Sequence, residues 1–284
     1  MENEIKLLER LINISNIEVE EPTAFGGFHL FCVLVVISLG TFLALRMRDS
    51  SDLTFRRIIG GMFLLMLVFE VTKQTLFCMS VSEGGVRYEY DWDAFPFQLC
   101  STPLYVLPLL AFLPDGTLRD AAAAYTMTFA FIGGVSVFIV PGTIFTPYLI
   151  KNIQTTVHHG IQVVSGMYTA SHYRKRANRR FYLLAVALFS ALYLVANLLN
   201  TVGYSLLVKL GAFEEGYPFN MFYVSPRADQ SAPVLNEFFD LVSPVIFIVL
   251  YFVVLSLCSA VVMYAVHRFT VGEKAHTPEK VTAG

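Results

Sequence analysis

The sequence predicts an all-α membrane protein, a helix bundle with about seven transmembrane helices. Hydrophobic residues make up 55% of the 284-residue chain and charged residues only 15%, whereas soluble domains carry about 25% charged residues. The mean hydropathy is +0.59. The formal net charge is −2, so the chain offers no general basic surface and we expect no nucleic-acid partner.

Seven stretches are apolar enough to cross a bilayer, since a span needs about 20 mostly apolar residues. The third and fifth stretches are short and carry polar groups. An alternative therefore has six spans and one re-entrant segment. The seven predicted spans are residues 28–45, 58–80, 97–113, 121–140, 153–171, 181–208 and 239–267.

These spans divide the chain into three regions. We expect an extracytoplasmic segment at residues 1–26, the seven-helix domain at 27–267 and a cytoplasmic tail at 268–284. The apolar residues between positions 5 and 12 fall on one helical face, which predicts an interfacial helix. The acid-rich start has no small-residue cleavage site after an early apolar core, so it is not predicted to be a signal peptide.

The orientation follows from the Lys and Arg residues. Thirteen of the 20 lie on one side of the predicted membrane, in the first loop, the loop after the fifth span, the tail and at Arg119. Six lie on the other side, and Lys73 falls inside the second span. Because basic residues favour the cytoplasmic side, we expect the N-terminus outside and the C-terminus in the cytoplasm.

Polar residues within the spans collect toward their outer halves. An Asp, Lys or Arg at mid-bilayer costs roughly 2.5–3.5 kcal/mol, so such groups usually face the bundle interior or a wet cavity. Glu70 and Lys73 share one helix face and can neutralise each other. Interhelical hydrogen bonding would explain any one residue, but the shared depth favours a pocket. The outer-half groups are His29, Glu70, Lys73, Gln74, Gln98, Cys100, Gln154, His158, His159, Gln162, Asn197, Asn200, Asn236, Glu237 and Asp240.

Cys100 and the His158–His159 pair are the candidates for chemistry. Pro96 suits a first helical turn, which would place Cys100 one turn into a helix, where the positive end favours a thiolate. A histidine beside a thiol can act as its base. The alternative is a packing cysteine with a hydrogen-bonding histidine pair. The histidines lack the spacing of a structural metal site and no Gly-rich phosphate loop occurs, so we expect neither a metal nor a cofactor.

Several short motifs carry a resemblance to a known family, from about Phe25 to the last span. In their order and spacing they resemble the YwaF-like bacterial integral membrane proteins, which are similar to vertebrate transmembrane protein 164. The motifs are Phe28-His29-Leu30, Phe97-Gln98-Leu99-Cys100, His159-Gly160, Asn197 with Asn200, and Phe219-Asn220-Met221-Phe222-Tyr223 followed by Pro226.

The resemblance implies a site and an activity. Transmembrane protein 164 places polyunsaturated acyl chains on ether phospholipids and uses a membrane-embedded cysteine aided by a histidine. Carried over, Cys100 matches the nucleophile and His159 the base, with Asn220 and Tyr223 in a supporting loop. The family often has a histidine two residues before the cysteine, where this chain has Gln98. The resemblance also implies a bacterial plasma membrane and membrane lipids as partners, with a phospholipid acyl donor and acceptor.

Three hypotheses follow. In the first, the protein is a lipid acyltransferase or acyl-ester hydrolase in which Cys100 forms a thioester and His159 moves the proton. Glu70, Asn197 or Asn200 would orient His159 or stabilise the oxyanion. In the second, a non-catalytic transporter or a lipid- or small-molecule-binding protein uses the same pocket. The third is a structural subunit without a cavity at the depth of Cys100. The sequence defines no oligomeric state.

Overall fold

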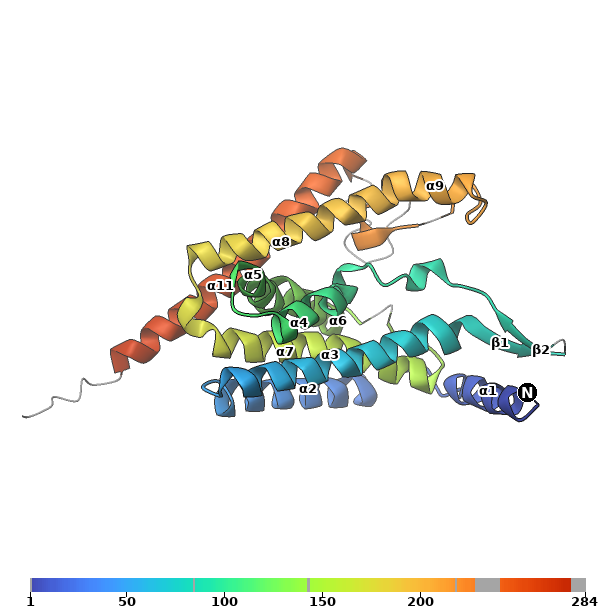
Figure 1. Ribbon diagram of the computed structural model, residues 1–284, viewed down its shortest axis with the longest axis horizontal. Helices are drawn as coiled ribbons and strands as arrows, with labels where there is room; N and C mark the ends of the chain where they lie inside the picture. Colours follow the sequence, from blue (N-terminus) through green and yellow to red (C-terminus); the bar gives the residue numbers. More distant parts are fainter. Residues whose placement is uncertain (1, 84, 142–143, 218, 228–240, 277–284) are drawn as a thin grey trace, which may run out of the picture.

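The computed structural model describes residues 2–83, 85–141, 144–217, 219–227 and 241–276. Most of this described chain is helical, with one two-stranded sheet, so the predicted all-α class is confirmed (Figure 1). Three predicted polar residues, Asn236, Glu237 and Asp240, and the predicted start of the last span at residue 239 lie outside the described residues.

The chain begins with α1 (Glu2–Ser15), α2 (Gly27–Arg46) and α3 (Asp52–Thr75). α1 contacts the region after α3 and the start of α7 and buries Ile12 completely. The start of α3 is fixed by Ser51, whose side chain accepts a hydrogen bond from the Thr54 N–H.

The predicted second span, residues 58–80, extends beyond the end of the helix that the structure shows. α3 stops at Thr75, a 3₁₀ turn follows as η1 (Leu76–Cys78), and the strands β1 (Met79–Ser82) and β2 (Gly85–Tyr88) form an antiparallel hairpin. Gly85 adopts a φ of 100° at the hairpin turn, a conformation that costs glycine little. The cross-strand pairing of this hairpin places Met79 and Ser80 in a strand instead of the predicted helix.

The third predicted span also begins later than expected. Pro103, rather than Pro96, occupies the first turn of α4 (Pro103–Phe112), and the 3₁₀ turn η3 (Leu99–Ser101) precedes it. Either proline suits a helix start because the missing N–H is not needed there. Cys100 therefore lies in a 3₁₀ turn just before the helix instead of one turn inside it.

The remaining elements complete the bundle. Two long helices contain a π-helical turn each, and such turns often occur at functional sites. The elements are η2 (Trp92–Ala94), α5 (Thr117–Tyr125), the π-helix η4 (Thr126–Ala130), α6 (Phe131–Ile139), α7 (Leu149–His172), η5 (Arg174–Arg176), α8 (Arg179–Leu198), the π-helix η6 (Leu199–Gly203), α9 (Tyr204–Lys209), η7 (Met221–Tyr223) and α11 (Pro244–His276).

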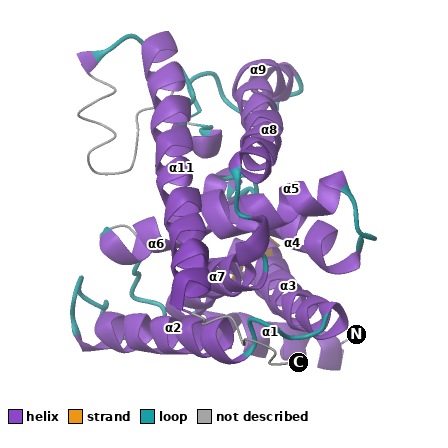
Figure 2. Ribbon diagram, turned by 90° about the vertical axis from the view of Figure 1, so that its left-hand side faces the viewer, coloured by secondary structure: helices purple, strands orange, loops and turns teal. Residues whose placement is uncertain are grey.

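Four helices in the described chain are long and apolar enough to cross a membrane: Gly27–Arg46, Thr117–Ile139, Arg179–Lys209 and Pro244–Val271. α3 and α7 have 24 residues each but carry more polar groups. The η3–α4 segment, Leu99–Phe112, is apolar but short. The molecule is thus built as a membrane helix bundle. α11 lies at the outside of this bundle (Figure 2), and only 11% of its apolar window is buried.

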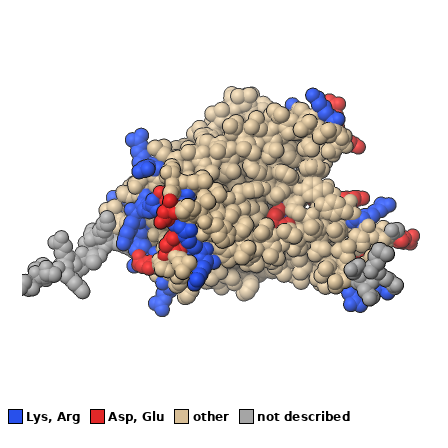
Figure 3. All heavy atoms as spheres, in the orientation of Figure 1, with Lys and Arg blue, Asp and Glu red and all other residues tan. Residues whose placement is uncertain are grey.

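α7 is the central helix, because it contacts α2, α3, α6 and the π-helix η4. Its neighbour α6 approaches closely at Gly134, where an added Cβ would lie 2.7 Å from the Cβ of Gln162 and 2.9 Å from the carbonyl oxygen of His159. This packing places the polar side chains in the middle of α7 inside the bundle. Lys and Arg gather mainly at the end that carries the α2–α3 and α7–α8 connections (Figure 3).

Candidate functional site

Cys100 and His158 meet between η3 and α7. Nε2 of His158 lies 2.9 Å from the Cys100 carbonyl oxygen. Because a carbonyl oxygen only accepts, Nε2 carries the hydrogen and Nδ1 of a neutral ring carries the lone pair. Within the described residues, this buried Nδ1 has no hydrogen-bond partner. The Cys100 thiol is free and its residue is partly exposed, so the turn that carries the candidate nucleophile is held by a histidine beside it.

His159 has the opposite tautomer. Its Nδ1 lies 2.7 Å from the carbonyl oxygen of Thr155, one turn earlier in α7, and therefore donates to it. Nε2 of the neutral ring is then the lone-pair nitrogen. The centroids of the two histidine rings are 5.3 Å apart. The pair thus presents two unprotonated nitrogens, Nδ1 of His158 and Nε2 of His159.

α3 contributes a buried charge pair to the same region. Lys73 Nζ lies 2.9 Å from Glu70 Oε1, and the side-chain amide of Gln74 donates to that oxygen at 2.7 Å. The predicted shared helix face of Glu70, Lys73 and Gln74 is therefore present. The Lys73 ammonium is close enough to act electrostatically on the Cys100 thiol and on both histidine rings. A positive charge therefore lies within electrostatic reach of the thiol and of both rings.

Gln98 and Asn200 hold the loop that contains η7. Gln98 donates to the carbonyl oxygen of Asn220 and accepts from the N–H of Phe222, while Asn200 makes the same two-way contact with the backbone of Met221. Within this loop, Phe222 and its neighbour Tyr223 have φ values of 58° and 57°, which are unusual for bulky residues. The two amide side chains therefore stabilise a strained backbone segment.

Other predicted site residues bond elsewhere. Asn197 donates to the carbonyl oxygen of Tyr193 in its own helix. Gln162 is fully buried against the glycines of α6, with no partner for its Oε1 among the described residues. His29 accepts a hydrogen bond from the Phe25 N–H and packs among Phe25, Phe138 and Phe145 near the start of α2. The amide groups thus contribute mainly to packing, while Cys100, Lys73 and the histidine pair form one cluster.

Hydroxyl groups complete this cluster, and the sequence analysis missed them. Thr102 and Tyr125 share a hydrogen bond of 2.8 Å, and Tyr125 directly precedes the π-helix η4. Tyr251 of α11 is close enough to Cys100 and Tyr223 for electrostatic interaction with both. Tyrosines in apolar helices are common, so only the π-helical turn and the tertiary contacts distinguish these residues.

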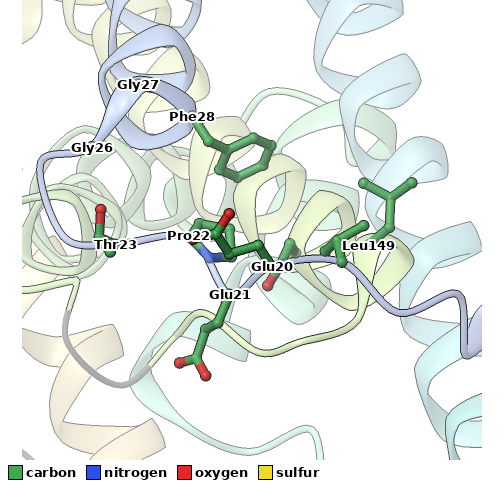
Figure 4. Close-up of a pocket in the computed structure, with 10 residues that line it drawn as sticks. Glu20, Glu21, Pro22, Thr23, Gly26, Gly27, Phe28 and Leu149 are labelled. Atoms are coloured by element: carbon green, nitrogen blue, oxygen red, sulfur yellow. The ribbon is translucent and has the colours of Figure 1, made fainter.

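A separate cleft opens near the start of α2. It has a volume of about 360 Å³ and is lined by residues 19–23, Gly26, Gly27, Phe28, Leu149 and Asn152 (Figure 4). Cys100 and the histidine pair are not among its lining residues. In the described part of the chain, no three His, Cys, Asp or Glu residues are grouped as around a metal ion.

The fold and the cluster define a helical membrane protein in which a buried histidine pair lies beside a partly exposed cysteine and a lysine. The model of the TMEM164 family matches residues 24–266. The chain therefore belongs to the TMEM164 family, and the predicted resemblance to transmembrane protein 164 is confirmed; the narrower YwaF-like grouping stays a prediction. No curated protein and no solved structure matches the chain significantly.

Proposed function

We propose that the protein is a membrane-embedded lipid acyltransferase or lipid acyl-ester hydrolase with Cys100 as its nucleophile. One observation carries this proposal: the hydrogen bond from His158 to the Cys100 carbonyl places the histidine pair of α7 beside the turn that bears the thiol. Membership of the TMEM164 family supports a lipid substrate. The outward-facing apolar helices would admit an acyl chain from the bilayer.

The reaction would proceed through a thioester. His159 Nε2 takes the thiol proton as the Cys100 sulfur attacks the ester carbon, and the ester carbonyl becomes an oxyanion. The C–O bond then breaks, and the leaving alcohol of the lipid receives the proton from His159. In the second half, water or a second lipid hydroxyl gives its proton to His159 and attacks the thioester. This releases the Cys100 thiolate, which recovers the proton.

The two histidines would have different roles. We assign the base role to His159, because it is the histidine that the family resemblance matches; its Nδ1–H is fixed on Thr155, which leaves the lone pair on Nε2. His158 positions the Cys100 turn through the backbone carbonyl. Lys73, held by Glu70, would stabilise the thiolate and the oxyanion. Gln98, Asn200 and the loop that they hold would shape the substrate pocket.

The proposal includes the membrane arrangement. We infer that α3, α7 and the short η3–α4 segment are spans besides the four long apolar helices, which gives seven. The buried polar side chains of α3 and α7 face the bundle interior, which explains their lower hydropathy. The basic end would then face the cytoplasm, with the N-terminus outside. A bacterial plasma membrane remains part of this proposal.

The first test is an acyl-enzyme trap. Wild-type protein and the Cys100→Ser and Cys258→Ser variants are purified from membranes fed an alkyne-labelled fatty acid. We expect label that neutral hydroxylamine releases from the wild type and from Cys258→Ser, a matched free thiol, but not from Cys100→Ser. If all three proteins are folded and none carries the label, the catalytic proposal fails and a non-catalytic binding or transport role is favoured.

The second test separates the histidines. We expect His159→Gln to lower the rate of thioester formation about 100-fold or more, as loss of a general base does. His158→Gln should lower it less, because it removes a positioning contact and leaves the base in place. The pH profile of acylation should lose its lower limb only in His159→Gln. The opposite order of effects would assign the base role to His158.

A further inference from the structure

A second cavity lies on the outside of the bundle at the basic end. It has a volume of about 300 Å³ and lies between the first turns of α8 and the last turns of α11, two helices that contact each other (Figure 2). Its lining combines cationic and aromatic groups with an apolar floor. The lining residues are Asn178, Arg179, Tyr182, Ala260, Met263, Tyr264 and His267.

The basic residues near this cavity differ in their availability. Arg174 donates to Asp49 at 2.7 Å, and Arg176 donates to Asp120. Arg179 forms no ion pair with any residue that the structure describes. Arg179 belongs to the same basic run as Arg174 and Arg176, but its positive charge is not neutralised by an ion pair within the described residues and remains available at this cavity.

Backbone polarity adds to this charge. Arg179 begins α8, a helix of 20 residues, so the positive end of the helix lies at the same place. His267 donates from Nδ1 to the Ala177 carbonyl oxygen at 2.8 Å, which fixes its ring beside Arg179 in the cavity lining. The polar end of the cavity thus fits an anion.

The other end of the cavity continues into apolar surface. Ala260, Met263, Tyr264 and His267 follow helical spacing on one face of α11, and Leu257 extends that face by one turn with 61% of its surface exposed. On α8, Leu183 is one turn beyond Arg179 and 52% exposed. A soluble anion would leave these residues uncovered, whereas a lipid acyl chain would cover them.

We propose that this cavity, together with the apolar surface that continues it along α8 and α11, is a groove that binds an anionic phospholipid. Its phosphate would contact Arg179, its chains would lie along the apolar faces of α8 and α11, and Tyr182 and Tyr264 would flank the boundary between them, as amphipathic rings do at membrane interfaces. The proposal concerns the basic end of the bundle and does not depend on the chemistry of Cys100.

The test is lipid binding measured by native mass spectrometry in a neutral detergent, where no bilayer surface contributes. Wild-type protein is titrated with phosphatidylglycerol and with phosphatidylcholine. The variants are Arg179→Ala and, as a matched control, Arg180→Ala, which removes the neighbouring exposed charge outside the cavity lining. We expect phosphatidylglycerol to bind at least about fivefold more tightly than phosphatidylcholine, and Arg179→Ala to weaken it about tenfold. Arg180→Ala should change it less than about twofold.

Three outcomes would overturn the proposal. Equal losses in the two arginine variants would mean diffuse charge attraction, and equal affinity for both lipids would mean no headgroup selection. Competition by soluble glycerol phosphate at the lipid's own concentration would assign the groove to a soluble phosphate compound. Melting temperatures without lipid verify folding. If Arg179→Ala does not fold, Tyr264→Ala replaces it as the test, because Tyr264 is an exposed residue of the cavity lining. This variant should also weaken phosphatidylglycerol binding, and unchanged binding would contradict the site.

Discussion

The side-chain oxygen of Gln98 accepts a hydrogen bond of 2.8 Å from the backbone N–H of Phe222. The same side chain donates to the carbonyl oxygen of Asn220 at 2.7 Å. Gln98 stands two residues before Cys100, so it links the turn that carries the thiol to the loop with two residues of positive φ. A change in the conformation of that loop should therefore alter the position of Cys100.

The first prediction concerns Gln98→Leu. This variant leaves one backbone donor and one acceptor of the η7 loop without partners, which costs about 1–3 kcal/mol of stability for each buried group. The melting temperature in detergent should fall, and hydroxylamine-labile acylation of Cys100 should fall with it. A variant with normal acylation would show that the loop and the thiol are independent.

The second prediction compares two asparagines of α8 and the π-helix that follows it. Asn200→Ala removes both contacts with the Met221 backbone and should destabilise the protein by about 1–3 kcal/mol. Asn197→Ala removes only a contact within its own helix and should cost less than about 1 kcal/mol. Unfolding in denaturant titrations measures both. Equal losses would refute the assignment of Asn200 as the residue that holds the loop.

The third prediction concerns helix packing beside His159. A Cβ at Gly134 would lie 2.9 Å from the His159 carbonyl oxygen, so Gly134→Ala should cost about 1–3 kcal/mol through overpacking and should lower Cys100 acylation. Gly61→Ala is the matched control, because nothing lies within 4 Å of its added Cβ. That variant should be neutral or slightly stabilising. Thermal unfolding of the two variants measures these changes in stability. If Gly134→Ala is as stable as the wild type, α6 can shift to accept the added methyl group and the packing argument is wrong.

The fourth prediction is a pH dependence at the basic end. Burial alone would raise the pKa of Asp52, but hydrogen bonds from Arg119 and Arg56 outweigh it and lower the pKa. The ion pairs of Asp52 therefore contribute fully above its unfolded pKa of about 3.9, and the contribution is lost as the pH falls through the lower folded value. The melting-temperature gap between wild type and Asp52→Asn should be constant from pH 7 to 5 and should narrow progressively below about pH 4. A gap that is as wide at pH 3 as at pH 7 would contradict this account.

Around Cys100, the sequence predicted some features of the structure and not others. The motif predicted the cysteine and the histidine doublet, and the spacing predicted the shared face of Glu70, Lys73 and Gln74. The predicted position of Cys100 relative to its helix was wrong, because Pro96 and Pro103 are both suited to the first turn of that helix. The helix starts at Pro103, and the preceding segment is held by His158 at Cys100 and by the η7 loop at Gln98.

The sequence by itself determined the class of protein. Its 55% hydrophobic content and long apolar stretches require a membrane helix bundle, because backbone groups in lipid must be paired within helices. The tertiary structure decided which polar residues meet. The contact of His158 with Cys100 joins residues 58 positions apart. Gln98 and Asn200 bind the backbone of residues 220–222 from positions next to a 3₁₀ turn and within a π-helix. Such turns depend on side-chain contacts between distant segments, which local spacing does not encode.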